Sequence, residues 1–345
     1  MRAIQLHRAE SLPEIREVAV PEPEAGQVLV KVAGAGVCHS DLHIMETPGA
    51  MGRPLPFTLG HECTGWVAAM GPGVTGLSAG EPVAVYAAWG CGLCRHCAQG
   101  RENYCTRLDE LGIEQPGLGR DGAMADYMIV DSPRHLVPLG DLDPVDSAPL
   151  TDAALTPYHA IKRSLGKLWA GSTAVVIGVG GLGHMAVQIL RAITPAQVIA
   201  LDIAEEKLEL AKASGAHLAM RADPGAVEEI RAVTGGLGAQ LVLDFVGAST
   251  TVELAVPLCA IDGDLTLIGI GAGVVPVGFG TTNYAVNVAT PYWGTRPELI
   301  EVLDLARRGA IKVRVERFPL GEALHVYDLL GRGKINGRAV LVPGG

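Results

Sequence analysis

Residues 173–183 read TAVVIGVGGLG, and this stretch decides the fold of the second half of the chain. Its first part, Thr173–Ile177, is an apolar, β-branched run that is typical of a buried strand in a parallel sheet. Its second part has the spacing GxGGxG from Gly178 to Gly183, and residues 181–193 then carry apolar side chains at helical spacing. The stretch therefore predicts a strand, a tight glycine turn and a helix in immediate succession.

The same rhythm continues on the C-terminal side of this unit. Val198–Leu201 predicts a second strand, and Ala204–Ser214 predicts an amphipathic helix that ends at Gly215. Further strands are expected at residues 217–220, 241–245 and 265–270, and further helices at residues 226–233 and 250–258. Strands that alternate with helices at this spacing indicate a doubly wound parallel α/β sheet.

The glycine turn and the end of the second strand together indicate a dinucleotide site. Gly178 permits the tight turn, Gly180 lets the backbone approach a pyrophosphate, and Gly183 allows the helix to pack closely on the strand. The helix N-terminus presents free N–H groups to the phosphates. Asp202 lies nineteen residues after Gly183. A carboxylate there accepts hydrogen bonds from ribose hydroxyls and repels a 2′-phosphate, which favours NAD over NADP. The alternative is a plain strand–helix turn followed by an exposed aspartate.

Length, charge and cysteine usage narrow the class of protein. A chain of 345 residues exceeds the size at which one core stops growing, so we expect two domains. A formal net charge of −10 argues against nucleic acid or anionic membranes as partners. The sequence has no run of 18 apolar residues and no apolar signal-peptide core at its N-terminus. Four of the seven cysteines fall between Cys91 and Cys105, which favours a metal site in a reducing cytoplasm over a disulfide framework.

Residues 1–150 follow a different pattern. Short apolar runs, such as Val28–Val32, Trp66–Met70 and Pro82–Tyr86, are broken by glycine and proline and predict a mostly β domain. The segment Leu142–Thr156 is polar and rich in proline, so we expect it to lead into the next unit. The tail, from about residue 289 to 345, returns to mixed strand and helix.

Four cysteines with the spacing CxxCxxCx₇C form one candidate metal site: Cys91, Cys94, Cys97 and Cys105. Four thiolates within one loop can close a tetrahedral zinc site that keeps no open position, so its role is expected to be structural. The alternatives are an iron–sulfur cluster, disulfides or unligated thiols. The bacterial ferredoxin run has a shorter last interval and a proline after its last cysteine, whereas Thr106 follows Cys105.

Two further segments gather side chains of the kinds that bind metals, namely residues 36–43 (GVCHSDLH) and residues 60–65 (GHECTG). Each histidine or cysteine taken alone is more often structural. Together they supply a thiolate, an imidazole and carboxylates, and a zinc with three protein ligands keeps one position open. An alcohol bound there loses its proton more easily, and the resulting alkoxide can give a hydride to a nicotinamide.

With these motifs in order, the chain resembles the zinc-containing alcohol dehydrogenases of the medium-chain dehydrogenase/reductase superfamily. Residues 60–74 match the family's zinc signature, GHExxGx₅GxxV. Residues 89–92 (WGCG), 100–105 (GRENYC) and 290–296 (TPYWGTR) are most similar to bacterial enzymes that act on secondary alcohols, ketones and aryl aldehydes. The resemblance spans the chain and implies three segments. They are a GroES-like catalytic domain at residues 1–150 with a zinc lobe at about 90–106, an NAD-binding Rossmann domain at 151–288, and a return to the catalytic domain at 289–345.

The resemblance also implies roles around a catalytic zinc. Cys38, His61 and Asp152 match its three ligands, with Asp152 in place of the cysteine that is common in the family. This harder ligand is expected to hold zinc less tightly or to accept cobalt more readily. Glu62 matches an acidic residue that ligates the zinc transiently, and Asp41 matches the partner that orients the imidazole of His61. The chain is therefore expected to hold two zinc ions, one catalytic and one structural.

Proton transfer and cofactor contacts are implied in the same way. Ser40 matches the hydroxyl that takes the substrate proton, and His43 lies where a relay through the nicotinamide ribose ends. The alternative for His43 is a surface histidine. His39 and Arg338 match contacts to the cofactor's phosphates, and Thr156 lies beside the nicotinamide. The remaining expected cofactor contacts are Gly178, Gly180, Gly181, Leu182, Gly183, Asp202 and Lys207.

Substrate and assembly are the least determined features. Leu118, Trp89, Tyr292 and Trp293 are candidates for the substrate pocket, and such walls favour hydrophobic alcohols, ketones or aldehydes. Each of these side chains is equally expected in core or subunit packing. One alternative is a polyol or threonine dehydrogenase of the same superfamily, and another is a non-catalytic NAD-binding redox sensor. A metal-free quinone or enoyl reductase is disfavoured because such relatives lack the zinc ligands. The resemblance implies a homotetramer or a dimer.

Overall fold

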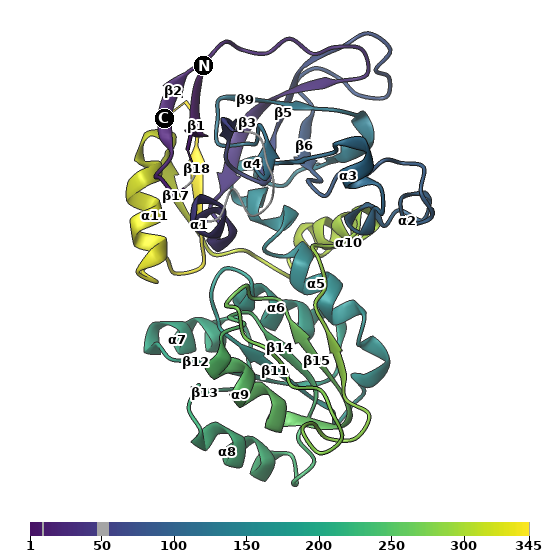
Figure 1. Ribbon diagram of the computed structural model, residues 1–345, viewed down its shortest axis with the longest axis vertical. Coiled ribbons are helices and arrows are strands. Elements are labelled where there is room, and N and C mark those ends of the chain that lie inside the picture. Colours follow the sequence, from purple (N-terminus) through teal and green to yellow (C-terminus); the bar gives the residue numbers. More distant parts are fainter. Residues whose placement is uncertain (9, 47–54, 345) are drawn as a thin grey trace. The chain divides into compact units, whose positions relative to one another are not determined.

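The computed structural model describes residues 1–8, 10–46 and 55–344. The chain divides into two compact units (Figure 1). The first comprises Met1–Leu155, Thr295–Arg307 and Val313–Gly345, and the second comprises Thr156–Gly294 and Arg308–Lys312. No helix among the described residues is long and apolar enough to cross a membrane.

The second unit is built on a six-stranded sheet with the order β13–β12–β11–β14–β15–β16, in which all neighbours are parallel. Its strands are β11 (Thr173–Ile177), β12 (Gln197–Asp202), β13 (Leu218–Arg221), β14 (Ala239–Asp244), β15 (Cys259–Leu267) and β16 (Asn287–Ala289). Its helices are α5 (Leu155–Lys162), η5 (Leu165–Lys167), α6 (Gly183–Ile193), α7 (Glu205–Ala213), α8 (Gly225–Val233) and α9 (Ser249–Leu258). The strand order reverses beside β11, so the expected doubly wound parallel sheet is confirmed.

Burial explains why this half was readable from its apolar runs. All five residues of β11 are buried, as a strand covered on both faces requires. Two differences are the short strand β16, which the sequence analysis did not predict, and β15, which begins at Cys259, directly after α9, rather than at Leu265. Its first residues pair with Ala239 of β14 before a shift in register, and Ile261 and Asp262 are exposed. This part of the strand therefore lacks the continuous apolar pattern that predicts a buried strand.

The first unit is mostly β, as expected. Its main sheet has the order β10–β6–β5–β3–β18–β17, with β9 also paired to β3, and a smaller sheet has the order β2–β1–β4. The strands of the main sheet are β3 (Val28–Gly36), β5 (Glu62–Met70), β6 (Pro82–Val85), β9 (Tyr127–Val130), β10 (Leu136–Pro138), β17 (Val315–Pro319) and β18 (Arg338–Val342). The others are β1 (Arg2–Leu6), β2 (Glu14–Glu17), β4 (Phe57–Thr58), β7 (Gln115–Pro116) and β8 (Gly119–Arg120).

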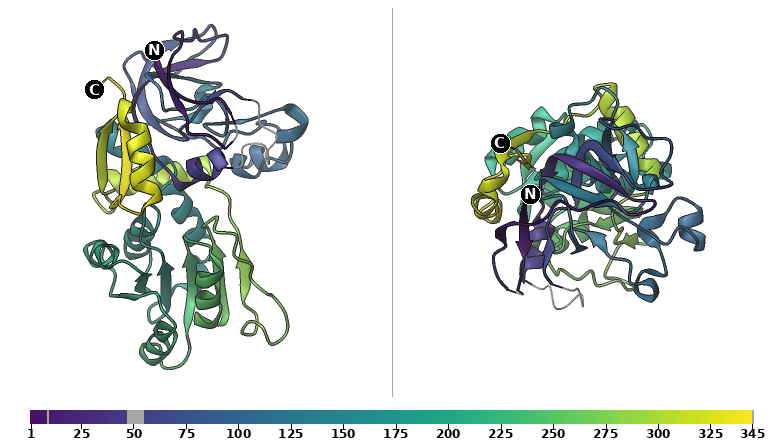
Figure 2. Two further views of the ribbon diagram at one scale, coloured as in Figure 1. Left: turned by 60° about the vertical axis from the view of Figure 1, so that its left-hand side comes forward. Right: turned by 90° about the horizontal axis from the view of Figure 1, so that it is seen from above.

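Short helices connect these strands, and the tail completes the sheet. The helices of this unit are α1 (His39–Glu46), α2 (Arg95–Ala98), η2 (Glu102–Tyr104), α3 (Leu108–Leu111), η3 (Pro133–His135), α4 (Pro144–Ser147), η4 (Ala148–Thr151), α10 (Arg296–Arg307), η6 (Leu320–Glu322) and α11 (Ala323–Gly331). Strand β18 pairs antiparallel with β3, at Val340 with Gly36 and Leu341 with Ala35. The C-terminal segment, yellow in Figure 2, therefore lies beside the first strands of the chain.

The segment Leu142–Thr156 runs up to the start of the second unit at Thr156, and its second half is buried. It forms α4 and η4 and then enters α5, and every residue from 147 to 156 is buried. Asp143 caps α4 by accepting a hydrogen bond from the backbone N–H of Asp146 at 2.9 Å. The small residues between the prolines pack into the first unit, so the segment is a part of the core that holds Asp152 in place.

Candidate metal and cofactor sites

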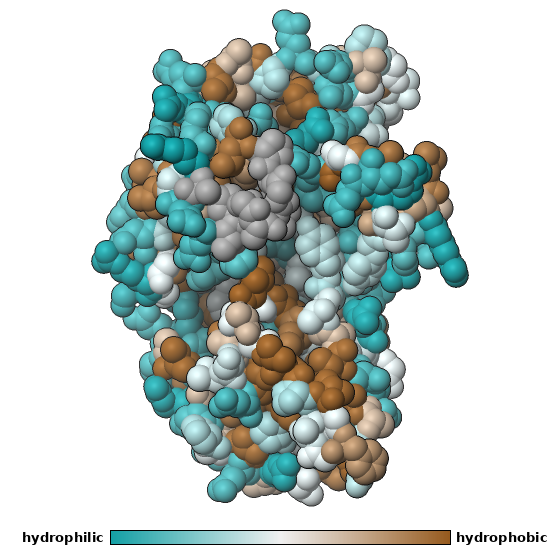
Figure 3. Space-filling model, viewed as in Figure 1, coloured by the Kyte–Doolittle hydropathy of each residue, from teal (hydrophilic) through white to brown (hydrophobic). Residues whose placement is uncertain are grey.

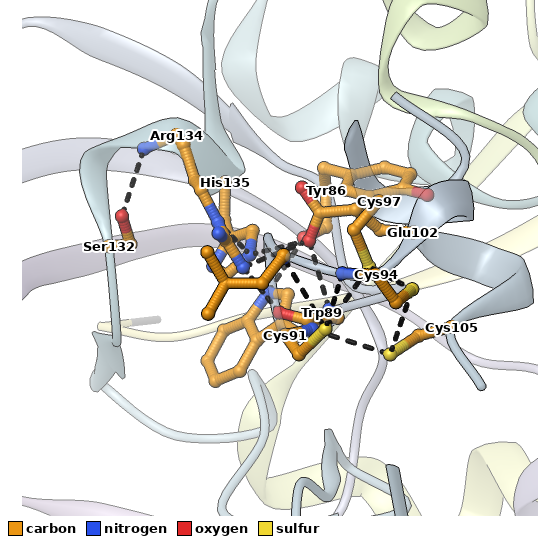
Figure 4. A network of polar contacts seen from close by, with 12 residues as sticks. Tyr86, Trp89, Cys91, Cys94, Cys97, Glu102, Cys105, Ser132, Arg134 and His135 are labelled. Atoms are coloured by element: carbon orange, nitrogen blue, oxygen red, sulfur yellow. Dashed lines mark hydrogen bonds and ion pairs between the residues drawn. The ribbon is translucent and has the colours of Figure 1, made fainter. Parts of the chain in front are cut away.

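The four cysteines of the predicted lobe come together in one cluster (Figure 4). The Sγ atoms of Cys91 and Cys97 are 3.8 Å apart, those of Cys94 and Cys97 3.4 Å, and those of Cys94 and Cys105 4.0 Å. A tetrahedral zinc with bonds of about 2.3 Å separates its sulfur ligands by roughly 3.8 Å. None of the four forms a disulfide. The cluster therefore has the composition and spacing of a closed zinc site.

Backbone N–H groups point at the lobe's sulfur atoms. Leu93 and Cys94 donate to the Sγ of Cys91 at 3.4 and 3.2 Å, and these hydrogen bonds lower the pKa of that thiol. Hydrogen bonds from the backbone of Cys97 and Thr106 lower the pKa of Cys94 to about 5. Donors placed in this way stabilise thiolates, the form that binds a metal.

A buried carboxylate ties the lobe to the sheet behind it. Glu102 Oε2 accepts hydrogen bonds from the backbone N–H of Gly90 at 2.9 Å and from Arg134 at 3.1 Å, and it lies 3.3 Å from Nε2 of His135. The His135 ring stacks on Trp89, whose side chain is buried and donates to the carbonyl of Tyr86 (Figure 4). Trp89 is therefore part of the support of the lobe, which is the packing alternative to the pocket role considered for it.

A second cluster joins residues that are distant in sequence. Cys38, His61, Glu62 and Asp152 each place a ligand atom within 4.8 Å of the others, and all four are buried. Cys38 follows β3, His61 and Glu62 lie where β5 begins, and Asp152 follows η4. Asp152 Oδ2 is 3.8 Å from Cys38 Sγ and 3.7 Å from His61 Nε2. The three residues expected as catalytic ligands thus meet at one point.

The residues present fit a zinc ion. A tetrahedral site with bonds of about 2.0–2.3 Å places its ligand atoms roughly 3.3–3.8 Å apart, which matches the two distances to Asp152. Thiolate, imidazole and carboxylate are all zinc ligands, and three protein ligands leave a fourth position open. Asp41 and Asp152 also raise the pKa of His61 above its ordinary value although burial lowers it, which shows how anionic the surroundings of the imidazole are.

Asp41, at the start of α1, faces the far side of the same imidazole. Its Oδ1 lies 3.3 Å from Nδ1 of His61, and its Oδ2 accepts a hydrogen bond from the backbone N–H of Cys38 at 2.9 Å. Contact through Nδ1 leaves Nε2 of His61 directed at Asp152 and the cluster. The hydroxyl of Ser40 lies 3.5 Å from the sulfur of Cys38. The structure thus brings Ser40 and Asp41 to the cluster, as the resemblance implied.

Glu62 and Arg338 form a buried pair beside the cluster. Arg338 Nε donates to Glu62 Oε2 at 3.1 Å, and its terminal nitrogen also lies 3.5 Å from Asp152. Burial raises the pKa of Glu62 to about 7, against the opposite effect of Arg338. Arg338 was expected at the cofactor's phosphates, but with 3% exposure its guanidinium serves two carboxylates of the first unit. The chain separation of this pair, 276 residues, left no local signal for it.

The other expected residues of the first unit do not belong to the Cys38 cluster. His39 and His43 are exposed on α1, whereas Leu118 is buried. In the second unit Thr156 is buried within α5, Lys207 is buried on α7, Tyr292 is exposed and Trp293 is buried. These positions agree with either interpretation of His43 and leave the roles of Leu118, Tyr292 and Trp293 open.

The glycine turn has the geometry that its sequence requires. Gly178 has a φ of 86°, and a Cβ on Gly183 would meet the carbonyl oxygen of Gly178 at 1.9 Å. A Cβ on Gly180, by contrast, would meet nothing within 4 Å, so the space in front of its backbone is open. Asp202 supports the turn, because its Oδ2 accepts a hydrogen bond from the N–H of Val179 at 2.7 Å.

Two apolar side chains at the same edge of the sheet were missed by the sequence analysis. Ile203 and Val246 follow the carboxyl ends of β12 and β14, and their side chains are 71% and 41% exposed. A Cβ on Gly178 would lie 2.7 Å from Val246, which places that side chain beside the turn. Exposed aliphatic side chains at this edge of the sheet can pack against the two faces of a flat aromatic ring of a bound ligand. The sequence signal that could have revealed this feature is the isoleucine directly after Asp202.

Comparisons with known proteins agree with the metal clusters of the first unit and with the cofactor site of the second. The alcohol dehydrogenase GroES-like domain matches residues 24–141, and the zinc-binding dehydrogenase domain matches residues 181–308. A NAD-dependent alcohol dehydrogenase from Sulfurisphaera tokodaii is 36% identical, over 99% of this chain and 100% of its own.

Two solved structures are similar over nearly the whole chain. The D-arabinose dehydrogenase from Sulfolobus solfataricus is 31% identical, with a TM-score of 0.86, over 99% of each chain. The acetophenone reductase from Geotrichum candidum, solved with NAD, is 30% identical, with a TM-score of 0.86, over 99% of this chain and 96% of its own. The Rossmann and GroES-like folds, the two ligand clusters and this similarity lead to one conclusion: the chain belongs to the zinc-binding, NAD-dependent alcohol dehydrogenases of the medium-chain superfamily.

Proposed function

We propose that this alcohol dehydrogenase interconverts hydrophobic secondary or aryl alcohols and their ketones or aldehydes, with Cys38, His61 and Asp152 as the ligands of its catalytic zinc. The observation that carries this assignment is the convergence of a thiol, an imidazole and a carboxylate at one buried point. When bound there, zinc acts as a Lewis acid that makes the substrate hydroxyl easier to deprotonate. The four lobe cysteines would hold the second zinc, which has no open position and stabilises the fold.

Residues of α1 are placed to move the substrate proton. Oxidation of an alcohol releases one hydride, which NAD takes, and one proton, which the protein must remove. The Ser40 hydroxyl, 3.5 Å from the sulfur of Cys38, is adjacent to the ligand cluster and suited to accept that proton. His43 is exposed three residues later on the same helix, where an imidazole can exchange protons with water. Asp41 orients His61 and does not itself meet the substrate.

The second unit is proposed to bind NAD at the carboxyl edge of its sheet. The open backbone at Gly180 and the N-terminus of α6 suit the pyrophosphate. Asp202 suits the adenosine ribose hydroxyls, and Ile203 and Val246 suit the faces of the adenine ring. Lys207, His39, Thr156 and Arg338 stay predictions as cofactor contacts. The first unit is then the catalytic domain and the second the cofactor domain.

The substrate class rests on similarity, which here points in two directions. Similarity to the acetophenone reductase suggests aryl ketones as substrates of this chain. Similarity to the D-arabinose dehydrogenase, which has an equal TM-score, suggests a sugar or polyol. The apolar candidates Leu118 and Trp293 support the first reading, because a polyol site needs a cluster of polar groups. A panel of 1-phenylethanol, 2-butanol, ethanol, sorbitol, D-arabinose and threonine with NAD decides between them. We expect the highest kcat/KM for 1-phenylethanol. Turnover confined to sugars or polyols would overturn the substrate proposal and leave the zinc chemistry intact.

Assembly and location complete the proposal. Apolar side chains are visible on the surface drawn in Figure 3. In the second unit Val274, Val277 and Phe279 are largely exposed, with Phe279 at 97%. Such a patch is unusual on a monomer and supports a homo-oligomer, for which we keep the tetramer as the first expectation and the dimer as the second. Light scattering of the purified chain measures this directly. The seven free cysteines support a reducing compartment, which we take to be the cytoplasm.

A further inference from the structure

His184 lies in the first turn of α6, directly after the glycine turn, and its side chain is only 1% exposed. Its Nδ1 lies 2.9 Å from the carbonyl oxygen of Gly180. A carbonyl oxygen can only accept a hydrogen bond, so Nδ1 carries the proton and donates it. The backbone N–H of His184 donates to the same oxygen at 3.2 Å. The carbonyl of Gly180 is therefore held by two donors that belong to one residue.

The direction of this carbonyl decides what the glycine turn presents to a ligand. In a trans peptide the C=O and the N–H of the next residue point in opposite directions. Because the carbonyl of Gly180 points along α6, the N–H of Gly181 points out of the N-terminus of the helix. No side chain among the described residues caps α6 there, and a Cβ on Gly180 would meet nothing within 4 Å. The N–H of Gly181 is thus directed into open space, where a phosphate oxygen can accept its hydrogen bond.

The peptide that joins Gly180 and Gly181 also needs to be held. Neither residue has a Cβ, so a peptide between them can rotate with little steric cost. A rotated peptide would place the carbonyl oxygen, which carries a partial negative charge, where the N–H stood, and it would repel a phosphate. Asp202 fixes the N–H of Val179 at 2.7 Å, but that hydrogen bond lies before Gly180 and does not fix the next peptide. The imidazole of His184 does.

We propose that His184 is a positioning residue for the pyrophosphate of the cofactor, acting through the peptide of Gly180 and Gly181. Its imidazole keeps the carbonyl of Gly180 turned into α6 and the N–H of Gly181 turned toward the phosphates. Buried behind the turn, the imidazole does not itself touch the ligand. The inference rests on the proposed binding of NAD at this turn, and it depends neither on the metal sites nor on the substrate.

The test is the affinity of full-length, zinc-loaded His184→Leu for NADH, ADP and adenosine, measured by NADH fluorescence and by competition with NADH. Leucine keeps a branched side chain and removes the donor. A hydrogen bond to a charged group is strong enough that its loss raises Kd about tenfold, which we expect for NADH and for ADP. The Kd for adenosine, which has no phosphate, should not change. In turnover, KM for NAD should rise while kcat stays nearly constant.

Two further variants separate positioning from packing. The side-chain nitrogen of asparagine is as many bonds from Cα as Nδ1 of histidine, so His184→Asn can still donate to Gly180 and should retain most of the affinity for NADH. Met185→Leu, an apolar change at the next buried residue of α6, should alter none of the three affinities. If the asparagine and leucine variants weaken NADH binding equally, or if adenosine binding weakens as much as ADP binding, His184 serves packing and the proposal is wrong.

Gly180→Ala distinguishes this inference from the proposed cofactor site. The added Cβ meets nothing in the protein but fills the space in front of the turn, so it should weaken NADH binding and leave the fold intact. If Gly180→Ala weakens NADH binding and His184→Leu does not, the cofactor site stands and the inference about His184 is wrong. If neither change affects NADH binding, the pyrophosphate lies elsewhere, and both the proposed cofactor site and this inference are wrong.

Discussion

The two ligand clusters of the first unit bring metal-binding side chains together in opposite ways. The lobe takes four identical ligands from fifteen consecutive residues, three of them partly exposed, and stabilises its thiolates with its own backbone N–H groups. The Cys38 cluster takes three different ligands from three separate segments, the first and last of which are 114 residues apart, and all are buried. The lobe therefore depends on the metal for its local shape, whereas the catalytic cluster is shaped by the fold around it.

This difference predicts how each site responds when its metal is lost. Four thiolates held this close repel one another when no metal binds them, so removing the zinc of the lobe should cost stability even though Glu102 also supports the lobe. The catalytic cluster keeps Asp41, Arg338 and the sheet around it when empty, so removing its zinc should cost activity and little else. The following changes separate the two outcomes, from the largest expected effect to the smallest.

Cys38→Ala should give the largest effect, on catalysis. Loss of one of three ligands should empty the catalytic site, and a Lewis acid worth several kcal/mol corresponds to a fall in kcat/KM of about a thousandfold or more. Zinc content should drop from two ions to one per chain, and the melting temperature should change little. Cys259→Ala is the control, because Cys259 is also a buried free cysteine but lies in the second unit. An active Cys38→Ala protein would remove Cys38 from the ligand set.

Cys94→Ser should give the largest effect on stability. We expect loss of the lobe zinc and a fall in the free energy of unfolding of about 3 kcal/mol, since loss of a structural metal is among the most destabilising single changes. Denaturant unfolding followed by circular dichroism measures this, with Cys259→Ala again as the matched cysteine. The remaining zinc should still support turnover per folded molecule. Unchanged stability after loss of the lobe zinc would contradict the structural role that we assign to this zinc.

The contrast between the sites also explains what the sequence made predictable. The lobe is visible in the spacing of its cysteines, and the strand–turn–helix at residues 173–193 is visible in its periodicity, because both are local. The residue types of the Cys38 and His61 segments indicated a metal site, but Asp152 was expected there only through resemblance to a family, since nothing local links it to His61. The partners of Arg338 and Trp89, and the burial of residues 147–156, depend on tertiary packing and therefore left no local signal in the sequence.

Asp152→Cys should sharpen the comparison by making the catalytic ligands more like those of the lobe. Thiolate is a softer ligand than carboxylate and binds zinc more strongly, so we expect chelator-driven release from this site to slow by about tenfold. The lobe's release rate serves as the reference within the same sample. Faster release in the variant would mean that the contacts of Asp152 with Arg338 and His61 matter more than the softness of the ligand.

The smallest expected effect concerns pH and the support of the lobe. Burial lowers the pKa of His135 below 6.5, although its hydrogen bond and charge interaction with Glu102 act in the opposite direction. The unfolded chain then binds more protons at this residue, so the stability of the folded state falls as the pH drops through 6.5. We expect His135→Gln to flatten the fall in the free energy of unfolding between pH 7 and pH 5.5 by less than about 1 kcal/mol. An identical pH profile would show that His135 titrates alike in both states.

The most direct test of the account uses Cys94→Ser protein, which should carry only the catalytic zinc. Zinc content and NADH formation from 1-phenylethanol are followed together while a chelator is added, and zinc is then restored. The account predicts that activity falls in proportion to the remaining zinc and returns when zinc is added back. Activity that persists after the last zinc has left would contradict the assignment of the Cys38, His61 and Asp152 site as the catalytic metal centre.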